Sequence, residues 1–197
     1  MTSILIIGGG GMIGQKLAAS FGENEKVSLL DVAFPEKSDL NATRIYGSIR
    51  DAKIMEKMLN SLPKTIFFLA SVVSGEAEEN FLKGWDVNVQ AFWGFLNNIK
   101  KLHVQSEGQY KPKVIFTSSI AVFGSPFPEK IPDNFLSAPR TSYGAQKVCC
   151  ELMLNDFIRK GFCEGLAIRL PTICVRPGKP NLAASSFFSG IIREPLN

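Results

Sequence analysis

The sequence predicts an α/β protein with a doubly wound parallel sheet, and three observations support that fold class. Residues 4–7 (ILII) form an apolar run without polar alternation, which is typical of a parallel strand covered on both faces. Glycines follow at once, and apolar residues then recur at helical spacing over 12–21. Apolar runs alternate with segments of helical periodicity to about residue 170, as expected when helices connect parallel strands.

The remaining elements follow in order along the chain. We expect further strands at 27–31, 44–46, 65–69, 113–117 and 166–170. Between them we expect a helix capped by Asp51, a long helix with an apolar stripe over 81–102, and a helix at 142–159 capped by Ser142 and ended by Gly161. Prolines in 124–139 predict a stiff loop beside the end of the fifth strand.

Composition is that of a globular protein and excludes several function classes. The net charge of +4 comes from scattered lysines rather than a basic stripe, so no nucleic-acid partner is expected. The apolar run near the N-terminus is too short for a signal peptide or a membrane span, so we expect no membrane partner and a cytoplasmic protein. The four cysteines lack metal-ligand spacing, so we expect reduced thiols and no metal site.

A glycine-rich turn joins the first strand to the first helix. Gly8, Gly11 and Gly14 form a G-x-x-G-x-x-G pattern. Gly8 permits the tight turn, Gly11 leaves room for a pyrophosphate, and Gly14 lets the helix pack closely on the strand. The amides at the helix N-terminus attract phosphates. The pattern predicts a dinucleotide-binding loop, and the alternative is a turn that is merely flexible.

Asp31 ends the second expected strand. A carboxylate there accepts hydrogen bonds from the ribose hydroxyls of an adenosine and repels a 2′-phosphate, so the expected cofactor is NAD rather than NADP. The alternative is an aspartate that only closes a turn at the strand end.

Tyr143 and Lys147 are four residues apart, so they share one face of the helix at 142–159. A free tyrosine has a pKa of about 10, and a neighbouring ammonium lowers that value. Ser119 ends the fifth strand, where ligands bind in open α/β sheets, and its hydroxyl is placed to orient a substrate hydroxyl near Tyr143. The pattern predicts proton transfer at a carbon that bears a hydroxyl, and the alternative is a tyrosine that only packs.

Asn88 lies within the long helix, although Asn is a poor helix former. We expect it either to support a water relay to Lys147 or to be a plain buried polar group.

These residues together resemble the extended short-chain dehydrogenase/reductase family. The resemblance rests on residues 8–14 (GGGGMIG), residues 118–124 (SSIAVFG), the Tyr143–Lys147 pair and Asn88. It covers about residues 3–180 and implies a Rossmann fold, NAD, and catalysis by Ser119, Tyr143, Lys147 and Asn88, with Lys147 also holding the nicotinamide ribose.

The resemblance also implies further contacts. Besides the glycines, Asp31, Tyr143 and Lys147, it implies cofactor contacts from Met12, Ile13, Ser48, Ile49, Leu69, Ala70, Ser71 and Thr172. It implies substrate contacts from Ser74, Gly75, Ser119 and Asn181. Two positions depart from the family pattern. Ser48 stands where an Asp often contacts adenine, and Phe123 stands where a Tyr is common.

Within the family, stretches at 9–14, 71–78, 123–128 and 169–178 are similar to the branch of D-erythronate dehydrogenases. This similarity implies a small-molecule substrate that is a free sugar acid, D-erythronate, oxidised at C2 with NAD. Two alternatives stay open: a nucleotide-sugar epimerase or dehydratase that retains its NAD, and a dinucleotide-binding module without catalysis.

The expected domain organisation follows from the same resemblance. We expect an NAD-binding domain over 1–170 and only the beginning of a substrate-binding region over 171–197, because extended members of the family are longer. Members often dimerise through the helices that correspond to 81–102 and 142–159, so the resemblance implies a homodimer.

Overall fold

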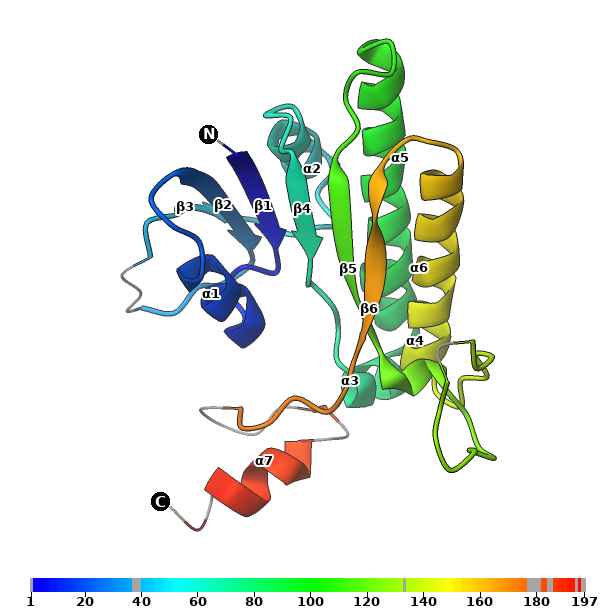
Figure 1. Cartoon of the computed structure of the whole chain (residues 1–197). Helices are drawn as coiled ribbons and strands as arrows, with labels where there is room; N and C mark the ends of the chain where they lie inside the picture. The colour runs from blue at the N-terminus through cyan, green and yellow to red at the C-terminus, as the bar shows by residue number, and fades with distance from the viewer. Residues whose placement is uncertain are drawn as a thin grey trace.

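The computed structural model describes residues 2–36, 40–132, 134–176, 182–183, 186–193 and 195. Its centre is a six-stranded sheet in the order β3-β2-β1-β4-β5-β6, with every neighbouring pair parallel (Figure 1). The strands are β1 (Thr2–Ile7), β2 (Glu25–Asp31), β3 (Thr43–Tyr46), β4 (Thr65–Phe68), β5 (Lys113–Ser119) and β6 (Glu164–Leu170). The predicted doubly wound parallel sheet is confirmed.

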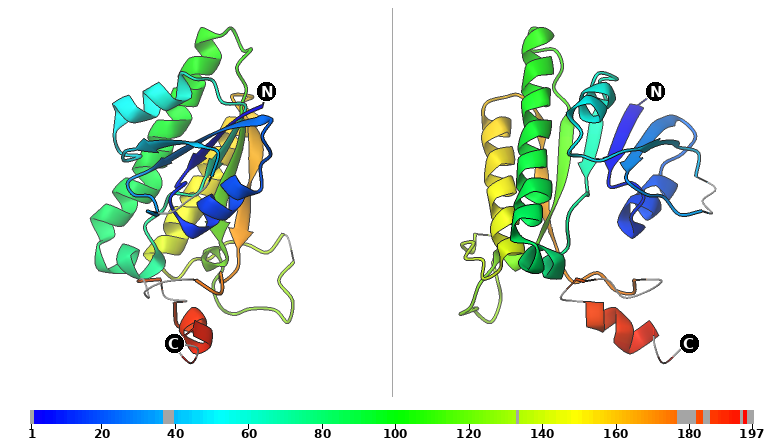
Figure 2. Two further views of the ribbon diagram at one scale, coloured as in Figure 1. Left: turned by 90° about the vertical axis from the view of Figure 1, so that its left-hand side faces the viewer. Right: turned by 180° about the vertical axis from the view of Figure 1, so that it is seen from behind.

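Helices lie on both sides of the sheet. The α-helices described are α1 (Met12–Ala19), α2 (Ala52–Leu59), α3 (Ser74–Glu79), α4 (Phe81–Trp85), α5 (Ala91–Gln105), α6 (Ser142–Arg159) and, below the sheet, α7 (Ser186–Arg193). α2, α5 and α6 lie against one face of the sheet, and α1 lies against the other (Figures 1 and 2). The apolar run in β1 supplies both cores, because successive side chains of a strand point to opposite faces. Leu5 and Ile7 join the larger core, whereas Ile4 and Ile6 pack with Ala18 of α1.

The carboxyl ends of the strands share one edge, which is the lower edge in Figure 1. The strand order reverses between β1 and β4, so the connections that leave these two strands diverge and open a crevice. Gly8 follows β1 and Leu69 follows β4 directly. The fold therefore brings the glycine loop and the residues after β4 to the same place.

The helix expected at 81–102 is interrupted, which the sequence did not predict. A π-helical segment, Asp86–Gln90, joins α4 to α5. Apolar residues at 81, 85 and 89 are spaced by four, a spacing that fits both an α-helix and the wider π turn. The segment carries Asn88 and lets the Asn88 carbonyl accept a hydrogen bond from the Cys150 thiol of α6 (3.1 Å).

α6 begins with a different cap from the one predicted. Thr141, not Ser142, is the N-cap, and its Oγ1 accepts a hydrogen bond from Gly144 N (3.0 Å). The Ser142 amide donates instead to the carboxylate of Glu78 in α3. α3 thereby binds the start of the helix that carries Tyr143.

After β6, residues 171–176 lie under the carboxyl edge of the sheet, and α7 lies below them, a helix that the sequence did not predict (Figure 1). The Arg176 amide donates a hydrogen bond to Ser189 Oγ of α7 (3.0 Å), and Ser189 is buried. Among the described helices none is long and apolar enough to cross a membrane. All four cysteines are free thiols.

Candidate functional site

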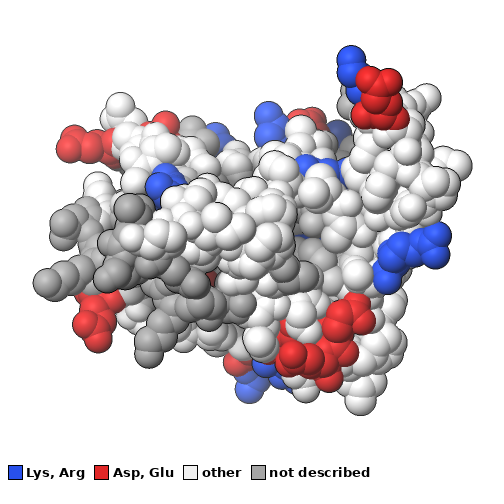
Figure 3. Space-filling model, turned by 90° about the horizontal axis from the view of Figure 1, so that it is seen from below, with Lys and Arg blue, Asp and Glu red and all other residues white. Residues whose placement is uncertain are grey.

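Two cavities open at the carboxyl edge of the sheet and adjoin each other. The first, of about 640 Å³, is lined by the glycine loop, and the second, of about 460 Å³, is lined by Ser119, Tyr143 and Lys147. The residues common to both linings are Ile13, Leu69, Val73, Thr117, Ile173 and Arg176. One continuous depression therefore connects the glycine loop to the predicted proton-transfer residues. Figure 3 shows this face, where most charged side chains lie toward the margins.

The glycine loop is tightly packed at Gly8 and Gly14 and leaves open space at Gly11. Gly8 has a φ of +88°, and a Cβ there would lie 2.6 Å from the Ala70 nitrogen. A Cβ at Gly14 would overlap the Gly8 carbonyl oxygen, so both positions require glycine. At Gly11 the nearest atom to an added Cβ is 3.5 Å away, so this residue leaves space for a ligand.

The N-terminus of α1 completes the phosphate side of this cavity. Gly11 is the N-cap and has no side chain that could bind the amides of the first turn. These amides lack partners within the helix and carry a partial positive charge. Lys16, on the same helix, also lines the cavity. This end of the depression therefore fits the negative charges of a dinucleotide pyrophosphate.

Asp31 lies against the glycine loop. Its Oδ2 accepts a hydrogen bond from Gly10 N (2.9 Å), and its Oδ1 accepts bonds from the amides of Val32 (2.7 Å) and Ala33 (3.4 Å). The carboxylate thus closes a turn, which was the alternative interpretation. An ionised carboxylate has about four acceptor positions, so it also keeps capacity for a ribose hydroxyl. The residues present fit the adenosine half of NAD.

The other expected cofactor contacts differ in where they lie. Ser71 and Thr172 line the second cavity, Met12 lines the first, and Ile13 and Leu69 line both. Ala70 lines neither, because it packs beneath the loop with its amide bonded to the Ile7 carbonyl (3.0 Å).

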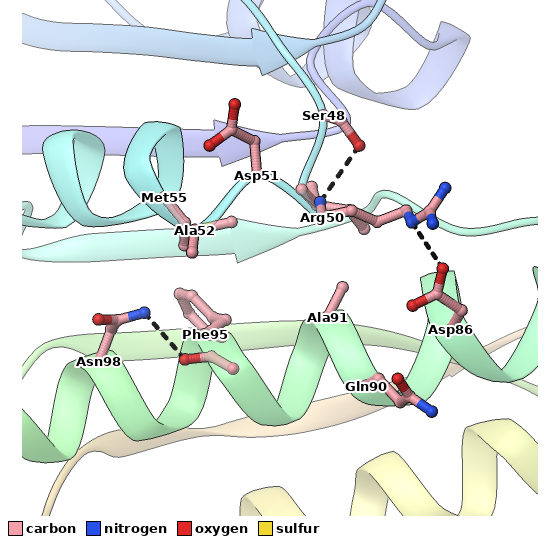
Figure 4. Close-up of a pocket in the computed structure, with 12 residues that line it drawn as sticks. Ser48, Arg50, Asp51, Ala52, Met55, Asp86, Gln90, Ala91, Phe95 and Asn98 are labelled. Atoms are coloured by element: carbon pink, nitrogen blue, oxygen red, sulfur yellow. Dashed lines mark hydrogen bonds and ion pairs between the residues drawn. The ribbon is translucent and has the colours of Figure 1, made fainter.

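Ser48 and Ile49 line a third, separate cavity of about 650 Å³ between α2 and α5. Figure 4 shows Arg50 reaching across its mouth to Asp86, with 2.6 Å between Arg50 Nε and Asp86 Oδ2. Ser48 Oγ accepts a hydrogen bond from Arg50 N (3.2 Å). The structure therefore does not bring these two expected cofactor contacts into the depression described above.

Tyr143 lies in the first turn of α6 and lines the second cavity. Burial raises the pKa of Tyr143 above its usual value, while a hydrogen bond with Ser71 and the positive charge of Arg176 lower it in part. The sequence predicted that Lys147 lowers this pKa, and the structure corrects that prediction. The desolvation of the phenol has the larger effect, and the groups that oppose it come from other segments.

Lys147 is buried beneath the cavity, with 2% of its surface exposed. Its Nζ donates a hydrogen bond to the Thr117 carbonyl (2.8 Å) and lies 5.4 Å from the centre of the Tyr143 ring. Burial lowers the pKa of Lys147 to about 8. Tyr143 and Lys147 are adjacent, as their spacing predicts.

Asn88 lies in a hydrogen-bond network that reaches Tyr143 through Ser71. Its Oδ1 accepts a hydrogen bond from Val72 N (2.7 Å) and lies 3.1 Å from Ser71 Oγ, and its Nδ2 donates to Gln146 Oε1 (2.7 Å). Because Ser71 also bonds Tyr143, Asn88 is linked to Tyr143 through Ser71. Asn88 is also a satisfied buried polar group, which was the alternative.

The expected substrate residues are only partly brought together. Ser119 and Ser74 line the second cavity, and Ser119 Oγ accepts a hydrogen bond from Ala121 N (3.1 Å). Gly75 is not among the lining residues, because it packs against the Leu182 carbonyl, to which its amide donates (2.9 Å). Asn181 lies outside the described residues.

Arg176 is a site residue that the sequence reasoning missed. It lines both cavities and acts electrostatically on Tyr143. The available signal was a lone arginine in the loop that follows the last strand, at the edge where ligands bind. Among the described residues that line the two cavities, the charged ones are Lys16, Lys147 and Arg176. The lining therefore favours anions.

Comparisons with known proteins agree with this geometry. The sequence matches the NAD dependent epimerase/dehydratase family over residues 4–196. It is 40% identical to a D-erythronate dehydrogenase of Cupriavidus necator, over 99% of this chain and 62% of that protein. It is 39% identical to a D-erythronate dehydrogenase of Haemophilus influenzae, over 98% of this chain and 62% of that protein.

Among solved structures, the fold is similar to that of a nucleoside-diphosphate-sugar epimerase from Agrobacterium tumefaciens. The TM-score is 0.87 and the sequence identity 46%, over 99% of this chain and 60% of that chain. The chain thus spans about three fifths of the length of the relatives that it matches.

Proposed function

Because the chain belongs to the NAD-dependent epimerase/dehydratase family, we propose that it oxidises a free sugar acid with NAD, with D-erythronate as the substrate and C2 as the oxidised carbon. The observation that carries this proposal is the continuous depression that joins the glycine loop to Ser119, Tyr143 and Lys147. The two relatives named D-erythronate dehydrogenase support the choice of substrate.

NAD would be held by the glycine loop, the first turn of α1 and Asp31, with its other half reaching Leu69, Ser71 and Thr172. Lys147 would hold the nicotinamide ribose. When bound, NAD supplies the acceptor for the hydride that leaves the substrate carbon.

The chain's own residues perform the proton transfer. Tyr143 Oη accepts the proton of the substrate hydroxyl, and Ser119 Oγ orients that hydroxyl toward it. The positive charge of Arg176 and the hydrogen bond with Ser71 favour the phenolate that this step needs, against the opposing effect of burial. Asn88 is a positioning residue, because it holds Ser71 and the chain at Val72.

A second candidate function is epimerisation or dehydration of a nucleotide sugar. The observation that favours it is the likeness to the Agrobacterium protein named nucleoside-diphosphate-sugar epimerase. Such an enzyme returns the hydride to its substrate and releases no NADH. Net NADH formation therefore separates the two candidates.

A homodimer is the partner that the family resemblance implies. α5 and α6 lie side by side on one face of the sheet (Figure 2). They expose Trp93 and Leu152 to solvent. Exposed apolar side chains of this size suit a helix-to-helix interface.

Replacing Tyr143 with Phe tests the assigned chemistry. Tyr143→Phe should lower kcat about 10²- to 10⁴-fold, because it removes the group that accepts the proton. Binding of NAD, measured by calorimetry, should change little, because the phenol oxygen is not part of the glycine loop. Tyr110→Phe is the matched control, since its buried hydroxyl donates to the Pro63 carbonyl far from the cavities (3.1 Å). Turnover by Tyr143→Phe close to that of the wild type would contradict the assignment.

A further inference from the structure

Arg176 occupies a particular place in the depression. Among the described residues that line both cavities, it is the charged one. We propose that the Arg176 guanidinium binds the carboxylate of the substrate and so selects free acids, an inference that rests on the proposed function.

The backbone of Arg176 is held in place. Its amide donates to Ser189 Oγ (3.0 Å), and Ser189 has 1% of its surface exposed within α7. The side chain therefore starts from an anchored point beneath the carboxyl edge of the sheet. Residues held in this way bind ligands with less loss of conformational freedom than residues on a free loop.

The chemistry of a 2-hydroxy acid fixes where its carboxylate must lie. The carboxylate carbon is bonded directly to the carbon that is oxidised. A group that binds the carboxylate must therefore stand next to the residue that accepts the hydroxyl proton. Arg176 meets this condition, because it lines the same cavity as Tyr143 and its charge acts on the Tyr143 hydroxyl.

The other two cations of the lining, Lys147 and Lys16, are not placed to bind a carboxylate next to the Tyr143 hydroxyl. Lys147 is buried, and its Nζ donates to the Thr117 carbonyl beneath the Tyr143 ring (2.8 Å). Lys16 lines the glycine-loop cavity and not the cavity of Tyr143. A guanidinium also matches a carboxylate better than an ammonium does, because it donates two parallel hydrogen bonds.

Arg176 also borders the glycine-loop cavity, so the anion could come from two sources. One is the substrate carboxylate, and the other is the pyrophosphate of the cofactor. An Arg176 that serves the cofactor would change NAD binding, whereas an Arg176 that serves the substrate would change the acid's affinity at constant NAD binding.

The experiment compares Arg176→Gln and Arg176→Lys with the wild type in the full chain. Arg159→Gln is the matched control, since Arg159 is exposed on α6 and pairs with Asp156. Steady-state rates give KM and kcat for D-erythronate, and calorimetry gives the Kd of NAD. Calorimetry of D-erythronate with the NAD-loaded Tyr143→Phe variant, with and without Arg176→Gln, measures substrate binding without turnover.

Arg176→Gln should raise the KM and the Kd for D-erythronate about 10- to 100-fold, the usual worth of a charge-assisted bond. Arg176→Lys should recover part of the loss, and the Kd of NAD should stay near the wild-type value. A KM unchanged in Arg176→Gln, or a loss confined to NAD binding, would overturn the inference while leaving the proposed function intact. A wild type that neither binds nor oxidises D-erythronate would instead overturn the proposed function, and the inference with it.

Discussion

The side chain of Lys147 lies in the site, but burying its charge lowers the stability of the fold. The ammonium is buried and is held by one carbonyl oxygen, that of Thr117 (2.8 Å). Burial lowers its pKa from 10.5 to about 8, because the charged form loses its hydration. The nearby carboxylate of Glu151 opposes this shift only in part. A cation in this position serves the chemistry at the expense of the free energy of unfolding.

Replacing Lys147 with Met should remove a pH dependence of stability. Between pH 8 and 10.5 the unfolded chain keeps the Lys147 proton and the folded chain has released it, so the free energy of unfolding rises with pH across this window. The rise amounts to about 3 kcal/mol if Lys147 alone is counted. Lys147→Met should lose both this rise and the enzyme's turnover.

Urea unfolding at several pH values measures this effect. Lys101→Met is the control, because Lys101 is exposed and pairs with Glu56, and it should keep the wild-type dependence. A Lys147→Met variant that retains the rise would show that Lys147 is not its source.

Which residues lie together in the site could be predicted where their spacing along one helix decides it. Tyr143 and Lys147 are adjacent because positions four apart on a helix must be neighbours. The pKa of Tyr143 could not be predicted in the same way, because it depends on burial and on two residues from distant segments. Arg176 escaped prediction because its place depends on how the chain returns beneath the sheet and binds Ser189.

At the scale of elements, α6 is tied to the two strands beside it by one buried carboxylate. Glu151 lies one helical turn after Lys147 and has 7% of its surface exposed. It accepts a hydrogen bond from Ser118 of β5 and two from Arg169 of β6 (3.0 and 2.8 Å). This cluster fixes α6 relative to the strand that ends at Ser119, and so helps to set the distance between Ser119 and Tyr143.

Glu151→Gln should destabilise the fold by about 2 kcal/mol, because it leaves the Arg169 charge without its counter-ion in a partly buried setting. Denaturant unfolding measures this loss. Glu164→Gln is the matched control: its pair with Lys111 is exposed, with 3.6 Å between the charged atoms, and its loss should cost about 0.5 kcal/mol or less. Equal effects of the two substitutions would contradict the assigned role of Glu151.

The elements themselves followed closely from hydrophobic periodicity, and the exceptions have local causes. The π-helical segment at Asp86–Gln90 is hidden because apolar residues spaced by four suit either helix type. The cap at Thr141 was displaced by one residue because Glu78, from a distant segment, binds the Ser142 amide. α7 is amphipathic, but its eight residues make only about two turns, which is shorter than the window over which helical periodicity is read.

At the scale of the whole molecule, the strand order creates the site. The reversal between β1 and β4 brings the glycine loop, the residues after β4 and the end of β5 to one edge of the sheet. The parallel fold and this edge could be predicted from the sequence, because strands alternate with helices along the chain. The joining of the two cavities could not, because the lining that they share comes from distant segments and includes Ile173 and Arg176, which lie under the sheet.

We propose that NAD and a free sugar acid bind in this depression and that the acid is oxidised there. The most direct test is to follow NADH absorbance while the full chain is mixed with NAD and either D-erythronate or a nucleotide sugar such as UDP-glucose. We expect steady NADH formation with D-erythronate and none with the nucleotide sugar. No NADH from any free sugar acid, together with conversion of the nucleotide sugar to its epimer, would contradict it.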